Sequence, residues 1–525
     1  MIFNTSLKII LLNTFLLIWI SPVICQKQEL SKSLEVITPQ KLKTHIDYLA
    51  SDALLGRNTP SPGLDSAATY IEKKFKAYGL LPANGSYYQP VPLVKTSLGA
   101  ENKVELSKDG VNTTLAIKTQ FVPYDITANG EVSGSLVFAG YGITAPEYNY
   151  DDYSGLDVKG KIVLVMRHEP GEQDSSSVFA GLDFTKHAYL ENKVKNAIDH
   201  GAAGMLVVTD PLNHMMINPR GFPWPSLSKM IPEDALPMYL KNEDIKKIPV
   251  VHVGKEVMNM VYGSVDSLKN IQAQIDRNMK PLSMPFPGIE IRIKTTVTDN
   301  PVKNSNIIGI LPGTDPELKN EYLIIGAHYD HVGYLKEYNP GEDYIINGAD
   351  DNASGTAGLL SIAEAFSKLK GKTARSILFI AFSAEEKGLY GSETYVNNPL
   401  VPLDKTVAMI NMDMISRNHI DTLYLVNASA SPDLTEIVKK ENKDIGFTIL
   451  YDEELTGRSD HANFQKKKIP FIFFFAGLHP DYHTVRDNPD SINPDKAARI
   501  SVLVFKTAQT IAQDKKRYTL IETNK

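Results

Sequence analysis

Cysteine is nearly absent from this chain of 525 residues, which contains one, at position 25. Cys25 follows an apolar run from Ile9 to Ile20 that Lys8 precedes, an order typical of a cleaved secretory signal peptide over residues 1–25. The run is shorter than a membrane-spanning helix requires. If Cys25 leaves with this segment, the mature chain can form no disulfide, cysteine nucleophile or thiolate metal site.

These features predict a secreted or periplasmic protein with no membrane span in its mature form. Lipid anchoring through Cys25 is the weaker alternative, because Ile24 is bulky where a lipoprotein signal requires a small residue. Any metal in the mature chain must then be held by histidine, aspartate and glutamate.

The chain also lacks an excess of positive charge, since 55 lysines and arginines face 61 aspartates and glutamates, for a net charge of -6. This balance gives no electrostatic reason to expect a nucleic-acid partner. The length exceeds what one hydrophobic core usually supports, so we expect two domains.

Changes in sequence pattern suggest where those domains begin and end. Residues 26–129 begin with two amphipathic helical patterns, and short strand-like runs follow from about residue 130. Prolines near residue 280 mark the next boundary. We interpret residues 130–280 as an inserted β-rich module, in which no cluster of metal-ligand residue types stands out, and expect the chemistry in residues 281–525.

Four apolar runs in the last segment have the continuous hydrophobicity of strands buried on both faces. Helical patterns alternate with them, which predicts an α/β fold with a mixed, mostly parallel central sheet flanked by helices. The runs cover residues 322–326, 377–382, 407–410 and 469–474.

Acidic residues and histidines follow these runs, and a further acidic pair precedes a helical pattern. Ligands in open α/β sheets bind beyond the carboxyl ends of the strands, so these side chains are expected to converge at one edge. They are His328, Asp330, Asp350, Asp351, Glu385, Glu386, Asp413 and His483.

Each of these residues also has a simpler interpretation. Asp350 could cap the following helix, Glu385 and Glu386 could form a solvated turn, and either histidine could be structural. Their convergence favours a metal site, because imidazole nitrogen and carboxylate oxygen are good zinc ligands. Two adjacent ions need a bridging carboxylate, and a further carboxylate must move the proton of the attacking water.

At these residues the chain resembles the secreted co-catalytic zinc aminopeptidases, whose relatives include glutamate carboxypeptidase, glutaminyl cyclase and the transferrin receptor. The inserted module resembles a protease-associated domain at Gly140–Ile143 and Gly201–Gly204. The main matching stretches are Gly326–His331, Asn347–Gly355, Phe382–Ser392, Asn411–Asp413, Gly457–His461 and Tyr482–Thr484.

The resemblance implies two zinc ions per chain bridged by Asp350. His328 and Glu386 would complete the protein ligands of one ion, and Asp413 and His483 those of the other. It also implies a cis peptide bond between Asp350 and Asp351.

The resemblance further assigns roles to residues around the ions. Glu385 would act as general base and then acid, and Asp330 would orient His328. Tyr482 would donate to the oxyanion, and Arg458 would contact the substrate. One departure concerns the segment after His483, where Arg486-Asp487-Asn488-Pro489-Asp490 replaces the family's acid-Thr-x-acid pattern.

The function expected from these features is a zinc-dependent aminopeptidase that hydrolyses N-terminal residues from peptides. A carboxypeptidase or a glutaminyl cyclase on the same scaffold is the first alternative, and a non-catalytic binding scaffold is the second. A nitrogen and oxygen site does not by itself distinguish zinc from manganese or cobalt.

Overall fold

A computed structural model describes residues 28–521, except 231–235, 242–245, 370, 454 and 456. The expected signal peptide at residues 1–25 lies outside the described residues, as does Cys25. Within the described part of the chain, no helix has both the length and the apolar character needed to cross a bilayer.

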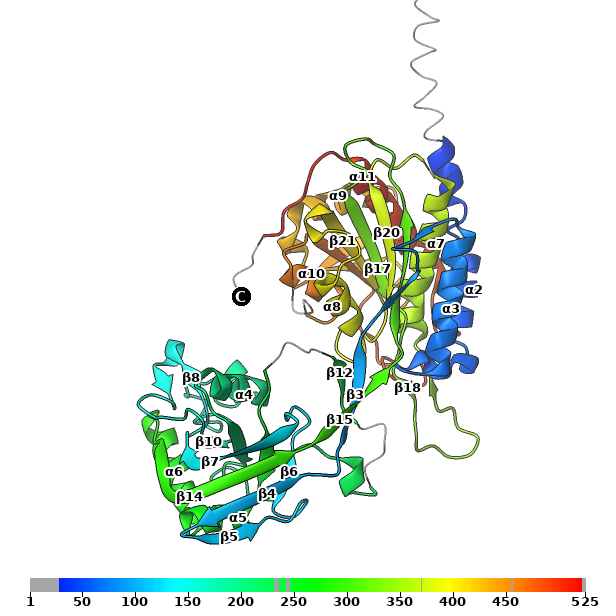
Figure 1. Cartoon of the computed structure of the whole chain (residues 1–525). Coiled ribbons are helices and arrows are strands. Elements are labelled where there is room, and N and C mark those ends of the chain that lie inside the picture. The colour runs from blue at the N-terminus through cyan, green and yellow to red at the C-terminus, as the bar shows by residue number, and fades with distance from the viewer. Residues whose placement is uncertain are drawn as a thin grey trace, which may run out of the picture. The chain divides into compact units, whose positions relative to one another are not determined.

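The chain forms two compact units, each with its own sheet and its own core. Among the described residues, unit 1 consists of those up to Leu93 and from Val302 onward, and unit 2 consists of those from Val94 to Pro301. Figure 1 shows both units, with the elements labelled.

Unit 1 is built on a nine-stranded mixed sheet with the order β1-β16-β20-β17-β21-β24-β22-β23, and β2 pairs with β16. The four neighbouring strands β20, β17, β21 and β24 are parallel to one another. The strands are β1 (Leu81–Pro82), β2 (Tyr88–Pro90), β16 (Ser305–Leu311), β17 (Tyr322–His328), β20 (Ser376–Phe382), β21 (Thr406–Asp413), β22 (Thr422–Val426), β23 (Thr448–Asp452) and β24 (Phe471–Phe475).

Helices cover both faces of this sheet (Figure 1). On β17, Leu323 and Ile325 belong to one core cluster and Ile324 to another, as the alternation of side chains along a strand requires. The larger cluster holds residues of α2 (Pro39–Leu49), α3 (Pro62–Ala77), α7 (Gly355–Lys368), α9 (Pro432–Asn442) and α11 (Pro494–Gln513), and the smaller holds residues of α8 (Tyr390–Asn397) and α10 (His461–Lys466). The expected α/β fold with a mixed, mostly parallel sheet flanked by helices is confirmed.

Helices α2 and α3 of unit 1 begin at clear sequence signals. The Thr38 and Ser61 side chains accept hydrogen bonds from the backbone N–H groups of Lys41 and Leu64, and a proline opens each helix. Both side chains satisfy N–H groups that a helix start leaves unpaired. The apolar faces of both helices pack into the larger core cluster.

Unit 2 contains an eight-stranded mixed sheet with the order β5-β4-β14-β7-β10-β11-β13-β6. The α-helices that accompany it among the described residues are α4 (Leu190–Asp199), α5 (Lys255–Tyr262) and α6 (Val265–Asn278). The strands are β4 (Lys103–Lys108), β5 (Val111–Thr114), β6 (Phe121–Pro123), β7 (Gly130–Phe138), β10 (Ile162–Met166), β11 (Gly204–Val208), β13 (Val250–Val253) and β14 (Met284–Thr295).

Smaller sheets complete the fold. Strands β12 (Met238–Leu240), β3 (Leu93–Leu98) and β15 (Val297–Val302) form a three-stranded sheet. Two further sheets have two strands each, one of β8 (Thr144–Ala145) with β9 (Tyr150–Asp151) and one of β18 (Gly333–Tyr334) with β19 (Ile345–Ile346).

Unit 2 is wider than the module of residues 130–280 expected from the sequence. The reason is strand pairing between distant segments, because β14 lies between β4 and β7 and pairs antiparallel with both. Strands on either side of the expected boundaries therefore complete one sheet, and the cores of unit 2 consist only of its own residues.

This arrangement predicts that residues 94–301 fold when expressed alone, since both their sheet and their core are complete. A fragment of residues 130–280 should fail to fold, because it lacks β14 from the middle of the sheet. Circular dichroism and a cooperative urea transition would distinguish the two fragments. Equal behaviour of the two would contradict the boundary at 94–301.

Candidate metal centre

The carboxyl ends of the parallel strands in unit 1 bring the predicted site residues together. β17 ends at His328 and β21 ends at Asp413, while Glu385 and Glu386 follow β20 after two residues. His483 lies in the loop after β24. The expected convergence of these side chains at one sheet edge is present.

One group of possible ligands contains His331, Asp351, Glu386 and His483. The Nε2 atom of His483 lies 3.0 Å from Asp351 Oδ2 and 3.2 Å from Glu386 Oε2. The other oxygen of Glu386, Oε1, lies 2.8 Å from His331 Nδ1. The two oxygens of Glu386 therefore face different histidines.

A second group contains His328, Asp351 and Asp413. His328 Nε2 lies 3.3 Å from Asp351 Oδ1 and 3.4 Å from Asp413 Oδ1. Asp351 is thus shared, with Oδ1 facing this group and Oδ2 facing the other. A carboxylate in this position can bridge two cations.

The shared residue is Asp351, which corrects the expectation that Asp350 bridges the ions. Asp350 Oδ1 instead accepts hydrogen bonds from the backbone N–H and the hydroxyl of Ser416, at 2.7 and 2.6 Å. The expected partners also change, since His328 groups with Asp413 and Glu386 with His483. The cis peptide bond lies between Asp351 and Asn352, one residue beyond the expected position.

Asp487 fixes the backbone on which Asp351 stands. Its carboxylate accepts hydrogen bonds from the N–H groups of Asp350, at 3.0 and 3.2 Å, and of Asp351, at 3.1 Å. This residue lies in the segment that departs from the family pattern, so the departure still supplies an acid that supports the centre.

Arg57 is a second supporting residue that the sequence analysis left without a role. It is fully buried, and its guanidinium donates to the backbone oxygens of Tyr329, Asn347 and Gly348, at 3.0, 2.8 and 3.0 Å. Burial lowers the pKa of Arg57 to about 10, although nearby carboxylates, Asp351 first among them, act to raise it. The side chain therefore stays charged and joins the loop after β17 to the loop before α7.

Glu385 lies beside the second group. Its Oε2 atom is 4.0 Å from His328 Nε2, and its backbone N–H donates to Asp330 Oδ1 at 3.1 Å. Burial raises the pKa of the Glu385 carboxyl well above its usual value, while His328 lowers it and Glu386 raises it.

Asp330 also lies next to His328, as expected for an orienting residue. His328 Nδ1 is 3.3 Å from the backbone oxygen of Asp330 and 3.7 Å from its Oδ1. Thr59 donates to the other carboxylate oxygen, Oδ2, at 3.0 Å. Asp330 therefore contacts both the His328 ring and the backbone at Glu385.

Tyr482 and Arg458 line a pocket that opens onto His328, Asp351, Glu385 and Asp413. The Tyr482 ring stacks on His483, with 3.8 Å between centroids. Burial raises the pKa of Tyr482 above its usual value, and the carboxylate of Asp351 raises it further. The rest of the wall is apolar and consists of Met414, Leu455, Phe473, Phe475 and Leu478.

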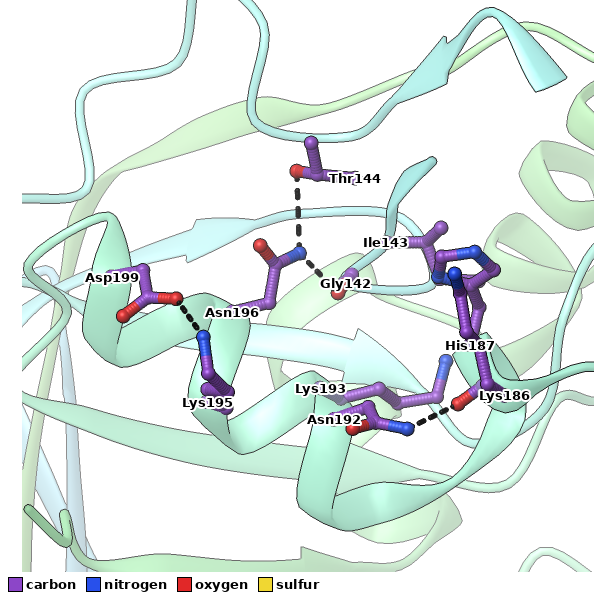
Figure 2. A pocket seen from close by; sticks show the side chains of 10 residues that line it. All are labelled: Gly142, Ile143, Thr144, Lys186, His187, Asn192, Lys193, Lys195, Asn196 and Asp199. Carbon is purple, nitrogen blue, oxygen red and sulfur yellow. Dashed lines mark hydrogen bonds and ion pairs between the residues drawn. The ribbon is translucent and has the colours of Figure 1, made fainter. Parts of the chain in front are cut away.

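Unit 2 has a pocket of a different kind, shown in Figure 2. Its polar side chains pair locally: Asn196 donates to Gly142 O and Thr144 Oγ1, and Lys195 pairs with Asp199. The Asn196 contacts hold α4 against Gly142 and Thr144, whereas the Lys195–Asp199 pair lies within α4. Asp199 is the one carboxylate among the residues that line this pocket.

The comparisons with known proteins match both units. Residues 306–508 match the model of Peptidase family M28, and residues 132–261 match the model of the PA domain. The two matched segments lie within unit 1 and unit 2, respectively, and they confirm the resemblance to a zinc peptidase with an inserted protease-associated domain.

Three individual relatives share 25–33% sequence identity with the chain. "Aminopeptidase YwaD" of Bacillus subtilis (strain 168) is 26% identical over 406 residues, which are 74% of this chain and 71% of that protein. "Leupeptin-inactivating enzyme 1" of Streptomyces exfoliatus is 33% identical over 183 residues, which are 35% of this chain and 38% of that enzyme.

"Glutamate carboxypeptidase 2 homolog" of Caenorhabditis elegans is 25% identical over 429 residues, which are 69% of this chain, and the match spans 51% of that protein. The chain thus spans about half the length of this relative and less than half the length of the Streptomyces enzyme. The structure titled "Aminopeptidase from Aneurinibacillus sp. strain AM-1" aligns with a TM-score of 0.50 at 21% identity, covering 94% of this chain and 98% of that one. This likeness supports the fold.

The geometry predicts different effects of two adjacent substitutions. Asp351→Asn should lower the affinity for both ions by more than the roughly 10–100-fold that loss of an outer partner costs. Asp350→Asn should stay within that range, because its amide oxygen can still accept from Ser416. Zinc titration of both apoproteins would measure this. A larger loss in Asp350→Asn would restore Asp350 as the bridge.

Proposed function

We propose that the chain is a zinc-dependent exopeptidase, and specifically an aminopeptidase, whose centre holds two zinc ions bridged by Asp351. The observation that carries this proposal is the sharing of Asp351 between two ligand groups, with Glu385 beside them. The M28 match and the aminopeptidase names of several relatives support it.

The residues of the centre fit zinc. Every candidate ligand is an imidazole nitrogen or a carboxylate oxygen, the donors that zinc accepts when thiolates are absent. Asp413 Oδ1 is buried and finds no hydrogen-bond donor among the described residues, so a cation there would satisfy it. Separations of 3.0–3.4 Å around His483 and His328 suit ligands of a common ion.

His331 is better assigned as a positioning residue than as a ligand. Its Nδ1 atom lies 2.8 Å from Glu386 Oε1 but 3.7 Å from Asp351 Oδ2. A hydrogen bond to the outer oxygen of Glu386 would aim the other oxygen at the ion, as outer partners of metal ligands commonly do.

Two zinc ions, when bound, lower the pKa of an attacking water and stabilise the charge that develops on the scissile carbonyl. Glu385 accepts the proton of this water and delivers it to the departing amine. Its burial keeps bulk water from the proton, and the hydrogen bond from its backbone to Asp330 fixes its position. Tyr482 stays protonated and can donate its hydroxyl to the oxyanion.

The apolar wall of the pocket suggests the substrate class. Phe473, Phe475 and Leu478 would accept an apolar N-terminal side chain, while the carboxylates at the inner end would attract the free amine. Arg458 could instead bind a substrate carboxylate, which keeps a carboxypeptidase as the second candidate.

We further propose that the protein acts outside the cytoplasm, in secreted or periplasmic form. Lys8, the apolar run from Ile9 to Ile20 and a plausible cleavage site after Cys25 support this, with lipid anchoring through Cys25 as the alternative.

A substrate panel tests the proposed reaction. Leucyl, phenylalanyl, glutamyl and lysyl chromogenic amides should be hydrolysed with the apolar residues preferred, and blocking the amine by acetylation should abolish turnover. Peptides with a free C-terminus but a blocked N-terminus provide the control. Cleavage of these blocked peptides from the C-terminus would favour the carboxypeptidase, and cyclisation of N-terminal glutamine the cyclase.

Replacing each of the two adjacent glutamates by its neutral amide should impair the enzyme in a different way. Glu385→Gln should keep both metals while kcat falls about 10²–10⁴-fold, the usual contribution of general acid–base catalysis. Glu386→Gln should weaken the ion next to His483, and excess zinc should partly restore its activity.

Metal analysis and steady-state kinetics on both variants would check this. Metal loss confined to Glu385→Gln would reverse the two roles. Near-normal activity in both variants would place the catalytic site elsewhere.

A further inference from the structure

Two loops of unit 2 carry metal-ligand residues at matching positions. His168 and Glu172 follow β10, and Asp210 and His214 follow β11, each pair spaced by four residues. β10 and β11 are parallel neighbours, with Met166 paired to Val208. Their carboxyl ends therefore deliver both pairs to the same edge of the sheet.

The four side chains converge on one point. His168 Nδ1 lies 2.7 Å from Asp210 Oδ1 and 2.9 Å from Glu172 Oε2. His214 Nε2 lies 2.9 Å from Glu172 Oε1 and 3.2 Å from Asp210 Oδ2. The two imidazole nitrogens are 3.1 Å apart.

These separations are close to the edges of a tetrahedron around a single ion. Zinc binds nitrogen and oxygen at about 2.0–2.2 Å, which places tetrahedral ligand atoms about 3.3–3.6 Å apart. The observed values of 2.7–3.2 Å need only a small outward movement of the side chains.

A network of ion pairs would satisfy these groups less completely. An imidazole N–H has only one hydrogen to donate. His168 Nδ1 nevertheless faces two carboxylates and a second imidazole nitrogen. Glu172 Oε2 and Asp210 Oδ2 are buried and accept no hydrogen bond from the described residues. A single cation would satisfy all four side chains at once.

The surroundings hold His168 in place. Phe184 stacks on its ring, with 5.1 Å between centroids and 3° between planes, and Lys193 Nζ donates to its backbone oxygen at 2.5 Å. Asp210 is completely buried, whereas His214 is partly exposed and gives an ion access from solvent.

We propose that His168, Glu172, Asp210 and His214 bind one zinc-class divalent cation that joins the loops after β10 and β11. Two nitrogen donors favour zinc over calcium or magnesium, which prefer oxygen. Four protein ligands are typical of a structural site. This proposal differs from the interpretation of the sequence, in which no cluster of metal-ligand residue types stands out in the inserted module. It does not depend on the proposed peptidase function.

The test counts zinc in the full chain after exhaustive removal of metal and reloading. An Asp351→Asn background depletes the catalytic centre, so about one zinc ion per chain should remain. Adding His214→Ala or the conservative Glu172→Gln should remove that ion. Adding His187→Ala should not, because this histidine, which lines the pocket in Figure 2, pairs with Glu147 and is not one of the four residues.

Hydrogen exchange of the same proteins supplies a local readout. Zinc should slow exchange in peptides that cover 168–172 and 210–214 in Asp351→Asn, and it should have no such effect once His214→Ala is added. Equal zinc content with and without His214→Ala, or equal loss in His187→Ala, would overturn the proposal. Failure of the peptidase assays alone would leave the zinc count unchanged, so the two proposals can fail separately.

Discussion

The structure of unit 1 depends on placing several carboxylates side by side in a buried space. Like charges at this distance repel one another, and burial adds a desolvation cost. At Asp351, burial acts to raise the pKa of the carboxyl, but His331, His328 and His483 outweigh it and hold that pKa well below its usual range. The histidines around Asp351 are therefore a condition for keeping it ionised, and an ionised bridge is what two cations require.

The remaining charges are balanced by the backbone and by one buried arginine. Asp487 and Arg57 do not face a ligand group of the centre, yet each fixes a loop that carries ligands. Arg57 comes from the segment between α2 and α3, so the N-terminal helices help to build a centre whose ligands all lie beyond residue 320. Removing the first segment of unit 1, which ends at Leu93, would thus disturb the centre without removing any ligand.

The sequence predicted the strand ends and most of the candidate ligands, because hydrophobic runs and the residues after them are local features. It could not separate Asp350 from Asp351, since two adjacent carboxylates look alike until the backbone path turns one of them toward Ser416. It also gave His331 and Arg57 no role, because their positions depend on hydrogen bonds to distant loops. The boundaries of unit 2 depend likewise on the pairing of β14 with β4 and β7.

The quartet of unit 2 escaped sequence analysis for the same reason. His168 and Asp210 are 42 residues apart, and each loop contributes only one histidine and one acid to the quartet. Only the parallel pairing of β10 with β11 joins the two half-sites. The main centre follows the same rule, because parallel β17 and β21, next to one another in the sheet, end at His328 and Asp413. In both units, adjacent parallel strands turn separate short segments into one ligand set, so strand order decides where a cation can be held.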